Sequence, residues 1–139
     1  MLEFVHSLRG GVLHEKKEIY ASGEDYLEAI LVLQEKKGMV RSVDLARYMD
    51  FSKPSISHAV AVLRKGGYLV KDMDGFICLT EKGRQIAEKI YERHRVITYM
   101  LVSLGVPDNI AESDACRIEH CISEESFEKL KKAFKDVIQ

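Results

Sequence analysis

The order of helix-forming segments in the first half of the chain constrains its fold more than any other feature. Ser22 begins a capping pattern, and the apolar residues that follow at helical spacing predict a helix that closes near Gly38. A second, short helix is predicted from Ser42, and a tight break follows it. Pro54, which is tolerated in a first helical turn, marks the start of a third helix that ends at Gly66-Gly67.

The segment after the third helix has the signature of a β-hairpin. Residues 68–71 and 76–79 are short β-type runs, and Asp74-Gly75 between them is a common hairpin turn. Helix, helix, tight turn, helix and hairpin form the plan of a winged helix-turn-helix domain, with predicted bounds of residues 22–79. An ordinary solvated helix in a small α/β domain is the alternative that one sequence leaves open.

The second half of the chain, residues 80–139, is predicted to be a helical domain. Thr80 caps a long helix to about Leu104, another helix spans about Asp108 to Ile122, and Ser123 caps a last amphipathic helix. The expected fold class is therefore mostly α with a small β-hairpin. Residues 1–21 form an N-terminal extension whose role the sequence does not reveal.

Charge is distributed unevenly along the chain. With 21 Lys and Arg against 22 Asp and Glu, the formal net charge is −1, which taken alone argues against a nucleic-acid partner. Residues 41–71 nevertheless hold six basic and two acidic residues, a local charge of +4, whereas residues 107–139 hold five basic and eight acidic residues, a charge of −3. This profile is typical of a basic DNA-binding unit joined to an acidic body.

Apolar runs and cysteine content exclude membrane and secreted proteins. The longest purely apolar runs, Ala29–Leu33 and Ala59–Leu63, are far shorter than the roughly 18 residues that a bilayer requires, and the N-terminus lacks an apolar signal core. Three cysteines, Cys78, Cys116 and Cys121, are too few for a disulfide scaffold. They favour a reducing cytoplasm, with free or metal-bound thiols.

The outward face of the third helix is suited to the DNA major groove. It carries Pro54, Ser55, His58 and Lys65, whereas Ile56, Ala59, Val60 and Leu63 lie on the inward side. Serine and histidine can bond base edges, and basic side chains can hold phosphates. The basic residues expected to support DNA binding are Arg41, Lys53, Arg64, Lys65 and Lys71.

A second group of residues has the chemistry of a metal site. In the predicted helix over residues 108–122, Cys116, Glu119 and His120 fall within an arc of about 100°, so a thiolate, a carboxylate and an imidazole share one face. Glu112 lies on the same arc and is an additional candidate ligand, whereas Cys121 does not.

Three further candidates lie on other predicted helices. Asp25 and Glu28 form an i, i+3 carboxylate pair whose repulsion a cation would relieve, and His94 lies in an apolar stripe. The candidate ligands also have simpler structural explanations. His94 could be a histidine bonded within the core, Asp25 and Glu28 could complement a helix dipole, and the Cys116 thiol could act as a small hydrophobe.

Taken together, residues 22–139 resemble the DtxR/MntR family of metal-dependent bacterial repressors. The resemblance rests on Glu24-Asp25-Tyr26-Leu27-Glu28, Ser52-Lys53-Pro54-Ser55-Ile56-Ser57-His58, Leu79-Thr80-Glu81-Lys82-Gly83, Arg93-His94-Arg95 and the segment from Asp114 to Ser123, each in the family's order and spacing. It implies a homodimer whose N-terminal winged helix binds double-stranded operator DNA when a divalent metal lies between the two domains. Residues 80–139 would then be a metal-binding and dimerisation domain.

The resemblance also implies roles for individual residues. Asp25, Glu28, His94, Cys116, Glu119 and His120 match the metal ligands, in agreement with the candidates taken from charge and helical position. Ser52, Pro54, Ser55, Ser57 and His58 occupy the positions where the family meets DNA.

The donor set combines features of two branches of the family. Asp25 and Glu28 are similar to the manganese branch and Cys116 to the iron branch, while Thr98 replaces a carboxylate of the iron branch's second site. We also expect the shorter, two-domain architecture of the manganese branch, without the SH3-like third domain of many iron-branch members. Because a thiolate softens a set of hard oxygen ligands, we predict a response to Mn²⁺ or Fe²⁺, with Zn²⁺, Co²⁺ or Ni²⁺ binding in vitro.

The sequence therefore predicts a cytoplasmic, metal-responsive transcriptional repressor of metal-uptake genes, with no membrane partner and no small organic substrate. A winged-helix regulator that senses a non-metal ligand or binds DNA constitutively is one alternative, for which Asp25 and His120 would lie far apart beside an apolar cavity. A metal-dependent enzyme and a dimeric helical adaptor are the others. The sequence does not reveal the operator, the target genes, or whether one or two ions bind per subunit.

Overall fold

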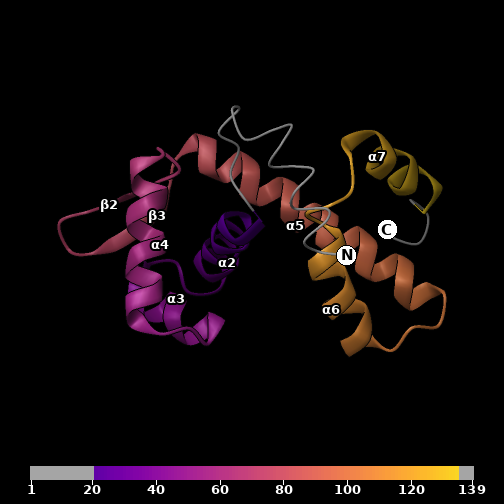
Figure 1. The fold of residues 1–139 in the computed structure, drawn as a ribbon, viewed down its shortest axis with the longest axis horizontal. Helices are drawn as coiled ribbons and strands as arrows, with labels where there is room; N and C mark the ends of the chain where they lie inside the picture. Colours follow the sequence, from indigo (N-terminus) through magenta and orange to yellow (C-terminus); the bar gives the residue numbers. More distant parts are fainter. Residues whose placement is uncertain (1–20, 135–139) are drawn as a thin grey trace.

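The computed structural model describes residues 21–134, which form a helical chain with one small sheet (Figure 1). The first half contains helices α2 (Ala21–Lys37), α3 (Ser42–Met49) and α4 (Lys53–Lys65) and strands β1 (Val40–Arg41), β2 (Leu69–Lys71) and β3 (Phe76–Leu79). The second half contains α5 (Glu81–Ser103), α6 (Asp108–Ile118) and α7 (Glu124–Ala133). The predicted fold class is confirmed. Residues 1–20 of the predicted extension lie outside the described residues. Among residues 21–134, no helix is long and apolar enough to cross a membrane.

The sheet has three antiparallel strands in the order β1-β3-β2, one more than the predicted hairpin. In the hairpin, Val70 of β2 lies opposite Cys78 of β3. The added strand β1 pairs Val40 with Ile77 on the other edge of β3. The prediction missed β1 because a strand of two residues is too short to show an alternating pattern.

The core of the first half forms where α2 packs against α3, α4 and the sheet. Leu27 and Ile30 of α2, Leu45 of α3, Ile56 of α4 and Ile77 of β3 are all buried. Ile56 belongs to the predicted inward side of α4, so the opposite side of that helix faces solvent. Burial of these side chains supplies most of the driving force that holds the hairpin against the helices.

The predicted helix starts at Thr80 and Ser123 are confirmed by their caps. The side-chain oxygen of Thr80 accepts a hydrogen bond from the amide of Gly83 at 3.1 Å, and that of Ser123 accepts one from Ser126 at 3.1 Å. Two boundaries were wrong. Ser22 lies inside α2 rather than at its cap, and α6 ends at Ile118 instead of continuing to Ile122.

Helix α5 connects the two halves, and its first turn is attached to the end of α4. Thr80 Oγ1 donates to the carbonyl of Gly67 at 2.7 Å, and Lys82 Nζ donates to the carbonyl of Gly66 at 3.1 Å. The ammonium of Lys82 also lies 4.4 Å from the ring centroid of Tyr68. Further along, α5 packs against both α2 and α6, so one rigid element spans the molecule (Figure 1).

Candidate metal centre and DNA-binding face

Side chains from three segments far apart in the sequence converge where the two halves meet. Two belong to α2, one to the middle of α5, and three to the end of α6 and the turn that follows it. They are the six predicted ligands Asp25, Glu28, His94, Cys116, Glu119 and His120.

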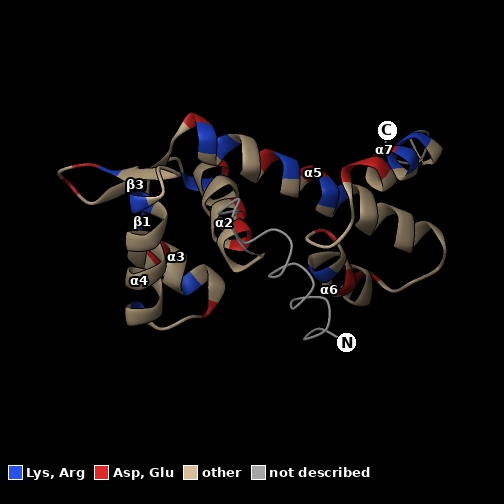
Figure 2. Cartoon of the chain, turned by 45° about the horizontal axis from the view of Figure 1, so that its top comes forward, with Lys and Arg blue, Asp and Glu red and all other residues tan. Residues whose placement is uncertain are grey.

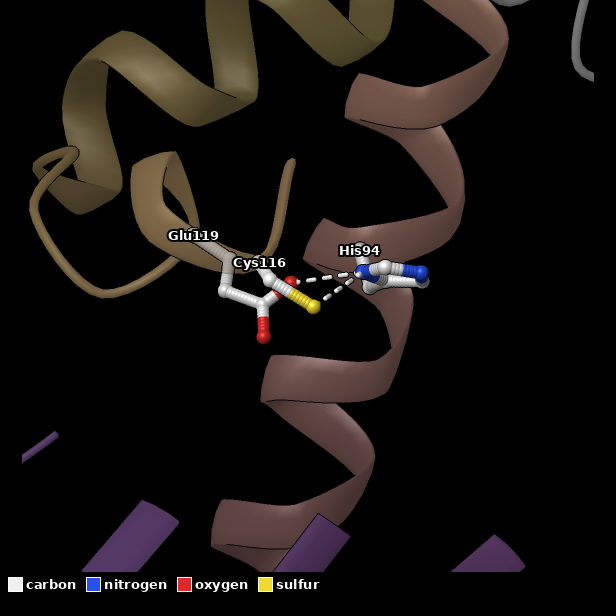
Figure 3. A group of neighbouring side chains, drawn as sticks. All are labelled: His94, Cys116 and Glu119. Atoms are coloured by element: carbon white, nitrogen blue, oxygen red, sulfur yellow. Dashed lines mark hydrogen bonds and ion pairs between the residues drawn. The ribbon is translucent and has the colours of Figure 1, made fainter. Parts of the chain in front are cut away.

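The first group, called here the His94 group, consists of His94, Cys116 and Glu119 (Figure 3). His94 Nδ1 lies 2.9 Å from Glu119 Oε1 and 3.9 Å from Cys116 Sγ. One donor atom from each side chain lies within 4.8 Å of the other two. Figure 3 shows the carboxylate and the thiol both directed at the imidazole from the same side.

The second group, called here the His120 group, consists of Asp25, Glu119 and His120. His120 Nε2 lies 2.7 Å from Asp25 Oδ1 and 3.4 Å from Glu119 Oε2. The other ring nitrogen, Nδ1, lies 2.8 Å from Glu24 Oε1. The sequence did not identify Glu24 as a functional residue, because the i, i+3 carboxylate pair in α2 consists of Asp25 and Glu28. The only local signal for Glu24 was its position next to Asp25.

Glu119 belongs to both groups and is fully buried. Its Oε2 accepts no hydrogen bond from any residue between 21 and 134. A buried carboxylate oxygen without a hydrogen-bond donor is costly unless a positive charge lies nearby, and His120 Nε2 at 3.4 Å or a metal ion can supply that charge. The donor set of thiolate, imidazole and carboxylate therefore fits a divalent transition metal, with Glu119 able to serve two adjacent positions.

The pKa values show how much negative charge is concentrated here. Hydrogen bonds to Cys116 and Glu119 raise the pKa of His94 to about 10. Burial opposes protonation of His120, but its bonds to Asp25 and Glu24 outweigh that effect and raise its pKa to about 10. Without a metal, protons on the two histidines compensate the carboxylates.

Glu28 lies in the cleft beside these groups. Burial, followed by repulsion from Glu119, raises the pKa of Glu28 to about 8. The cleft has a volume of about 1120 Å³ and is also lined by Glu112, Thr98 and Cys116. Glu112 is exposed and belongs to neither group, so its place among the ligands stays a prediction.

The helical-arc argument for Cys116, Glu119 and His120 was only partly correct. Cys116 lies within α6, but Glu119 is the residue at its C-terminal cap and His120 lies in the following turn. Departure from the helix directs His120 to α2, whereas Glu119 reaches α5. A continuous helix would have directed both side chains to one neighbour.

All ten residues predicted to support DNA binding are exposed. Most lie on α4 and at its N-terminal cap, where Ser52 accepts a hydrogen bond from the amide of Ser55 at 3.3 Å. The exposed residues are Arg41, Ser52, Lys53, Pro54, Ser55, Ser57, His58, Arg64, Lys65 and Lys71.

The structure uses one of these residues to brace the wing formed by β2 and β3. Arg41 Nη1 donates to the carbonyl of Asp74 at 2.5 Å, and its guanidinium lies 4.1 Å from the ring centroid of Phe76. The tip of the wing is acidic, with Asp72 and Asp74 exposed (Figure 2). Because acidic groups repel phosphates, the tip is unsuited to contact with the DNA backbone.

Comparisons with known proteins agree with this architecture. A family model described as the N-terminal DNA-binding domain of iron-dependent repressors matches residues 18–75, and one described as their metal-binding and dimerisation domain matches residues 80–137. An HTH-type transcriptional regulator from Methanocaldococcus jannaschii is 34% identical over 120 residues, covering 83% of this chain and 96% of that protein. MntR from Shouchella clausii is 34% identical over 109 residues, covering 78% of this chain and 76% of that protein.

The fold matches a solved structure of the manganese regulator SloR with a TM-score of 0.74 at 30% identity. That match covers 81% of this chain and 53% of SloR, so this chain spans about half of that protein. The matched proteins are DNA-binding transcriptional regulators, which removes the enzyme from the alternatives. On the two family models, the relatives and the shared fold, the chain belongs to the DtxR/MntR family of metal-dependent transcriptional regulators.

Proposed function

We propose that the chain is a transcriptional repressor that binds operator DNA when a divalent metal joins its two halves. One observation carries the proposal: the buried carboxylate of Glu119 contacts His94 of α5 on one side and lies 3.4 Å from His120, which is bonded to Asp25 of α2, on the other. Ligands from both halves thus meet at one side chain.

The proposed ligands are the six residues predicted from the sequence, Asp25, Glu28, His94, Cys116, Glu119 and His120. A bound cation would supply positive charge that favours the ionised form of Glu28, whose pKa burial and Glu119 raise to about 8 in its absence. Hard carboxylates and imidazoles favour Mn²⁺ or Fe²⁺, and the Cys116 thiolate adds affinity for Zn²⁺, Co²⁺ and Ni²⁺. The contact between Asp25 and His120 at 2.7 Å disfavours the non-metal sensor, for which these residues would lie apart.

We also propose that the chain works as a homodimer. The ends of α5 and α6 expose apolar side chains that a second copy would cover, and the family model over residues 80–137 describes a dimerisation domain. The exposed residues are Tyr99, Val102, Leu104, Ile110 and Ile118. In such a dimer, α2 held in place through Asp25 and Glu28 would favour the arrangement in which the two α4 helices lie about 34–36 Å apart, one turn of DNA.

The proposal is tested by measuring DNA affinity with and without metal. A duplex is first selected from a random-sequence pool by the protein in Mn²⁺, and its binding is then followed by fluorescence anisotropy at fixed salt. We expect binding at least tenfold tighter in Mn²⁺ or Fe²⁺ than in chelator, and no such response from Glu119→Gln. Equal affinity in metal and chelator would contradict metal control and favour constitutive DNA binding.

A further inference from the structure

Arg93 is a buried arginine in α5, next to the proposed ligand His94. The proposed ligand set assigns no role to Arg93. Arg93 is 6% exposed, and its guanidinium packs 5.4 Å from the ring centroid of the buried Phe127 in α7. A guanidinium removed from water is costly unless its donors are bonded, so its partners reveal what it stabilises.

The partners of Arg93 are two backbone carbonyls in the turn after α6 and one carboxylate at the start of α7. Nη1 donates to the carbonyl of Glu119 at 3.1 Å and to that of Ile122 at 2.7 Å. Nη2 donates to the carboxylate of Glu124 at 3.1 Å. The last carbonyls of a helix carry partial negative charge and lack partners within the helix, so a cation placed there is favourable.

These bonds occupy backbone carbonyls that follow the last residue of α6, Ile118. In a continuing helix, the carbonyl of Glu119 would accept from the amide four residues on, but here it accepts from Arg93. The chain turns at residues 119–122, and the side chains of Glu119 and His120 reach α5 and α2 respectively. The guanidinium of Arg93 therefore binds the turn that carries two proposed ligands.

We propose that Arg93 is a positioning residue of the metal centre, which orients Glu119 and His120 by binding the carbonyls of residues 119 and 122. The inference rests on the proposed function, since it assigns Arg93 a role in the same site. In this proposal Arg93 is not itself a ligand. It acts through the backbone of the ligands, and its loss would let the turn move by enough to spoil ligand geometry.

The test compares Co²⁺ binding by the full chain and its variants, using metal affinity and the thiolate-to-Co²⁺ absorption band. For Arg93→Met, which keeps length but loses all donors, we expect a loss of about 10- to 100-fold in affinity and a weakened or shifted band. Arg93→Lys, which can reach one carbonyl, should fall between Arg93→Met and the parent chain. Glu124→Gln, which leaves both carbonyl contacts in place, should stay within a few-fold of the parent.

Arg84→Met is the matched control, because Arg84 lies on the same helix, is partly exposed and pairs with Glu88. Unfolding of each metal-free variant is measured in parallel. If Arg93→Met lowers stability but keeps the parent's Co²⁺ affinity and absorption band, the positioning role is overturned. If Arg93→Met does not fold, Arg93→Lys decides the question: a Co²⁺ affinity and an absorption band equal to those of the parent chain would overturn the positioning role. A parent chain that binds no Co²⁺ would instead refute the proposed metal centre itself.

Discussion

At the scale of single residues, the proposed centre differs from a site of carboxylates and imidazoles alone through Cys116. Its Sγ lies 3.9 Å from His94 Nδ1, and its side chain opens to the cleft. In the proposed site hard and soft donors would act on one ion, so a single side chain would tune its selectivity. On the other side, Glu24 bonds the ring of His120 without belonging to either ligand group.

Replacement of Cys116 by glutamate is expected to shift selectivity towards manganese. Cys116→Glu exchanges the one soft donor for a hard carboxylate, so affinity for Mn²⁺ relative to Zn²⁺ or Co²⁺ should rise by about tenfold or more. Competition titrations measure this ratio. Cys121→Ser is the control, because Cys121 is exposed and lies outside both groups. Unchanged relative affinities in Cys116→Glu would show that this thiol is not a ligand.

Removal of Glu24 is expected to weaken metal binding through the orientation of His120. A carboxylate on Nδ1 fixes the ring so that Nε2 faces Asp25 and Glu119. Glu24→Ala should lose about tenfold in Mn²⁺ affinity by calorimetry, and Glu24→Gln, which keeps an acceptor oxygen, should lose less. Glu35→Ala, on the exposed end of α2, serves as the control. Equal affinities for Glu24→Ala and the parent would refute this role.

At the scale of elements, hydrogen bonds attach the start of α5 to the end of α4, so the position of the DNA-binding half is coupled to that of the long helix. The first turn of α5 bonds the carbonyls of Gly66 and Gly67, and the middle of the same helix carries His94. Gly83 permits this close packing, because an added Cβ would lie 2.0 Å from the carbonyl oxygen of Tyr68. That oxygen belongs to backbone and cannot swing aside as a flexible side chain can.

Substitution of Gly83 by alanine is expected to disturb DNA binding more than metal binding. The clash with Tyr68 should cost about 1–3 kcal/mol of unfolding free energy, as overpacking does elsewhere. Because the displacement lies at the end of α4, operator affinity in Mn²⁺ should fall several-fold while Co²⁺ affinity stays near that of the parent. Denaturant unfolding, anisotropy and metal titration provide the three readouts. Arg84→Ala, one residue on, is the control, and parent-like stability in Gly83→Ala would contradict the packing argument.

At the scale of the whole molecule, charge separation makes the protein sensitive to its metal supply. The exposed basic residues predicted to contact DNA lie mostly on and beside α4, while carboxylates from α2 and the turn after α6 meet His94 and His120 at the proposed metal centre. The net charge of −1 therefore understates the working charge of a metal-loaded protein. Protons and metal compete for the same groups, which links folding, metal binding and pH.

The metal-free protein is expected to lose stability as pH rises, while its metal affinity increases. His94 and His120 have folded pKa values of about 10, above the ordinary value of 6.5, so their stabilising effect is complete below about pH 6.5 and lost towards pH 10. The raised pKa of Glu28, about 8, adds a loss between its ordinary value of 4.5 and pH 8. Both histidines must be neutral to ligate, so binding releases protons.

Calorimetry in buffers of different ionisation enthalpy measures this release at neutral pH, and denaturant unfolding at several pH values measures stability. His120→Gln should reduce both the proton release and the slope of stability with pH. Metal affinity independent of pH between about 6 and 9 would contradict the proposed ligand set.

Local sequence signals predicted most of the elements and the chemistry of the donors. Thr80 and Ser123 could be predicted as caps because a side-chain oxygen at a helix start accepts a hydrogen bond from an amide of the first turn. The inward side of α4 followed from helical spacing. The turn at Asp74-Gly75 and the thiolate, imidazole and carboxylate types were equally local. Strand β1 escaped because it exists only through pairing with β3.

What the sequence determined by itself is thus the set of helices, the hairpin and the residues able to bind a metal, since periodicity, capping and side-chain chemistry depend on near neighbours in the chain. Only the tertiary structure decided that Glu119 is shared by two groups, that Glu24 bonds His120 and that α6 ends at Ile118. The first two outcomes depend on contacts across 25 residues for His94 with Glu119 and 96 residues for Glu24 with His120. No local pattern encodes them, because the partner that satisfies each buried group is supplied by packing.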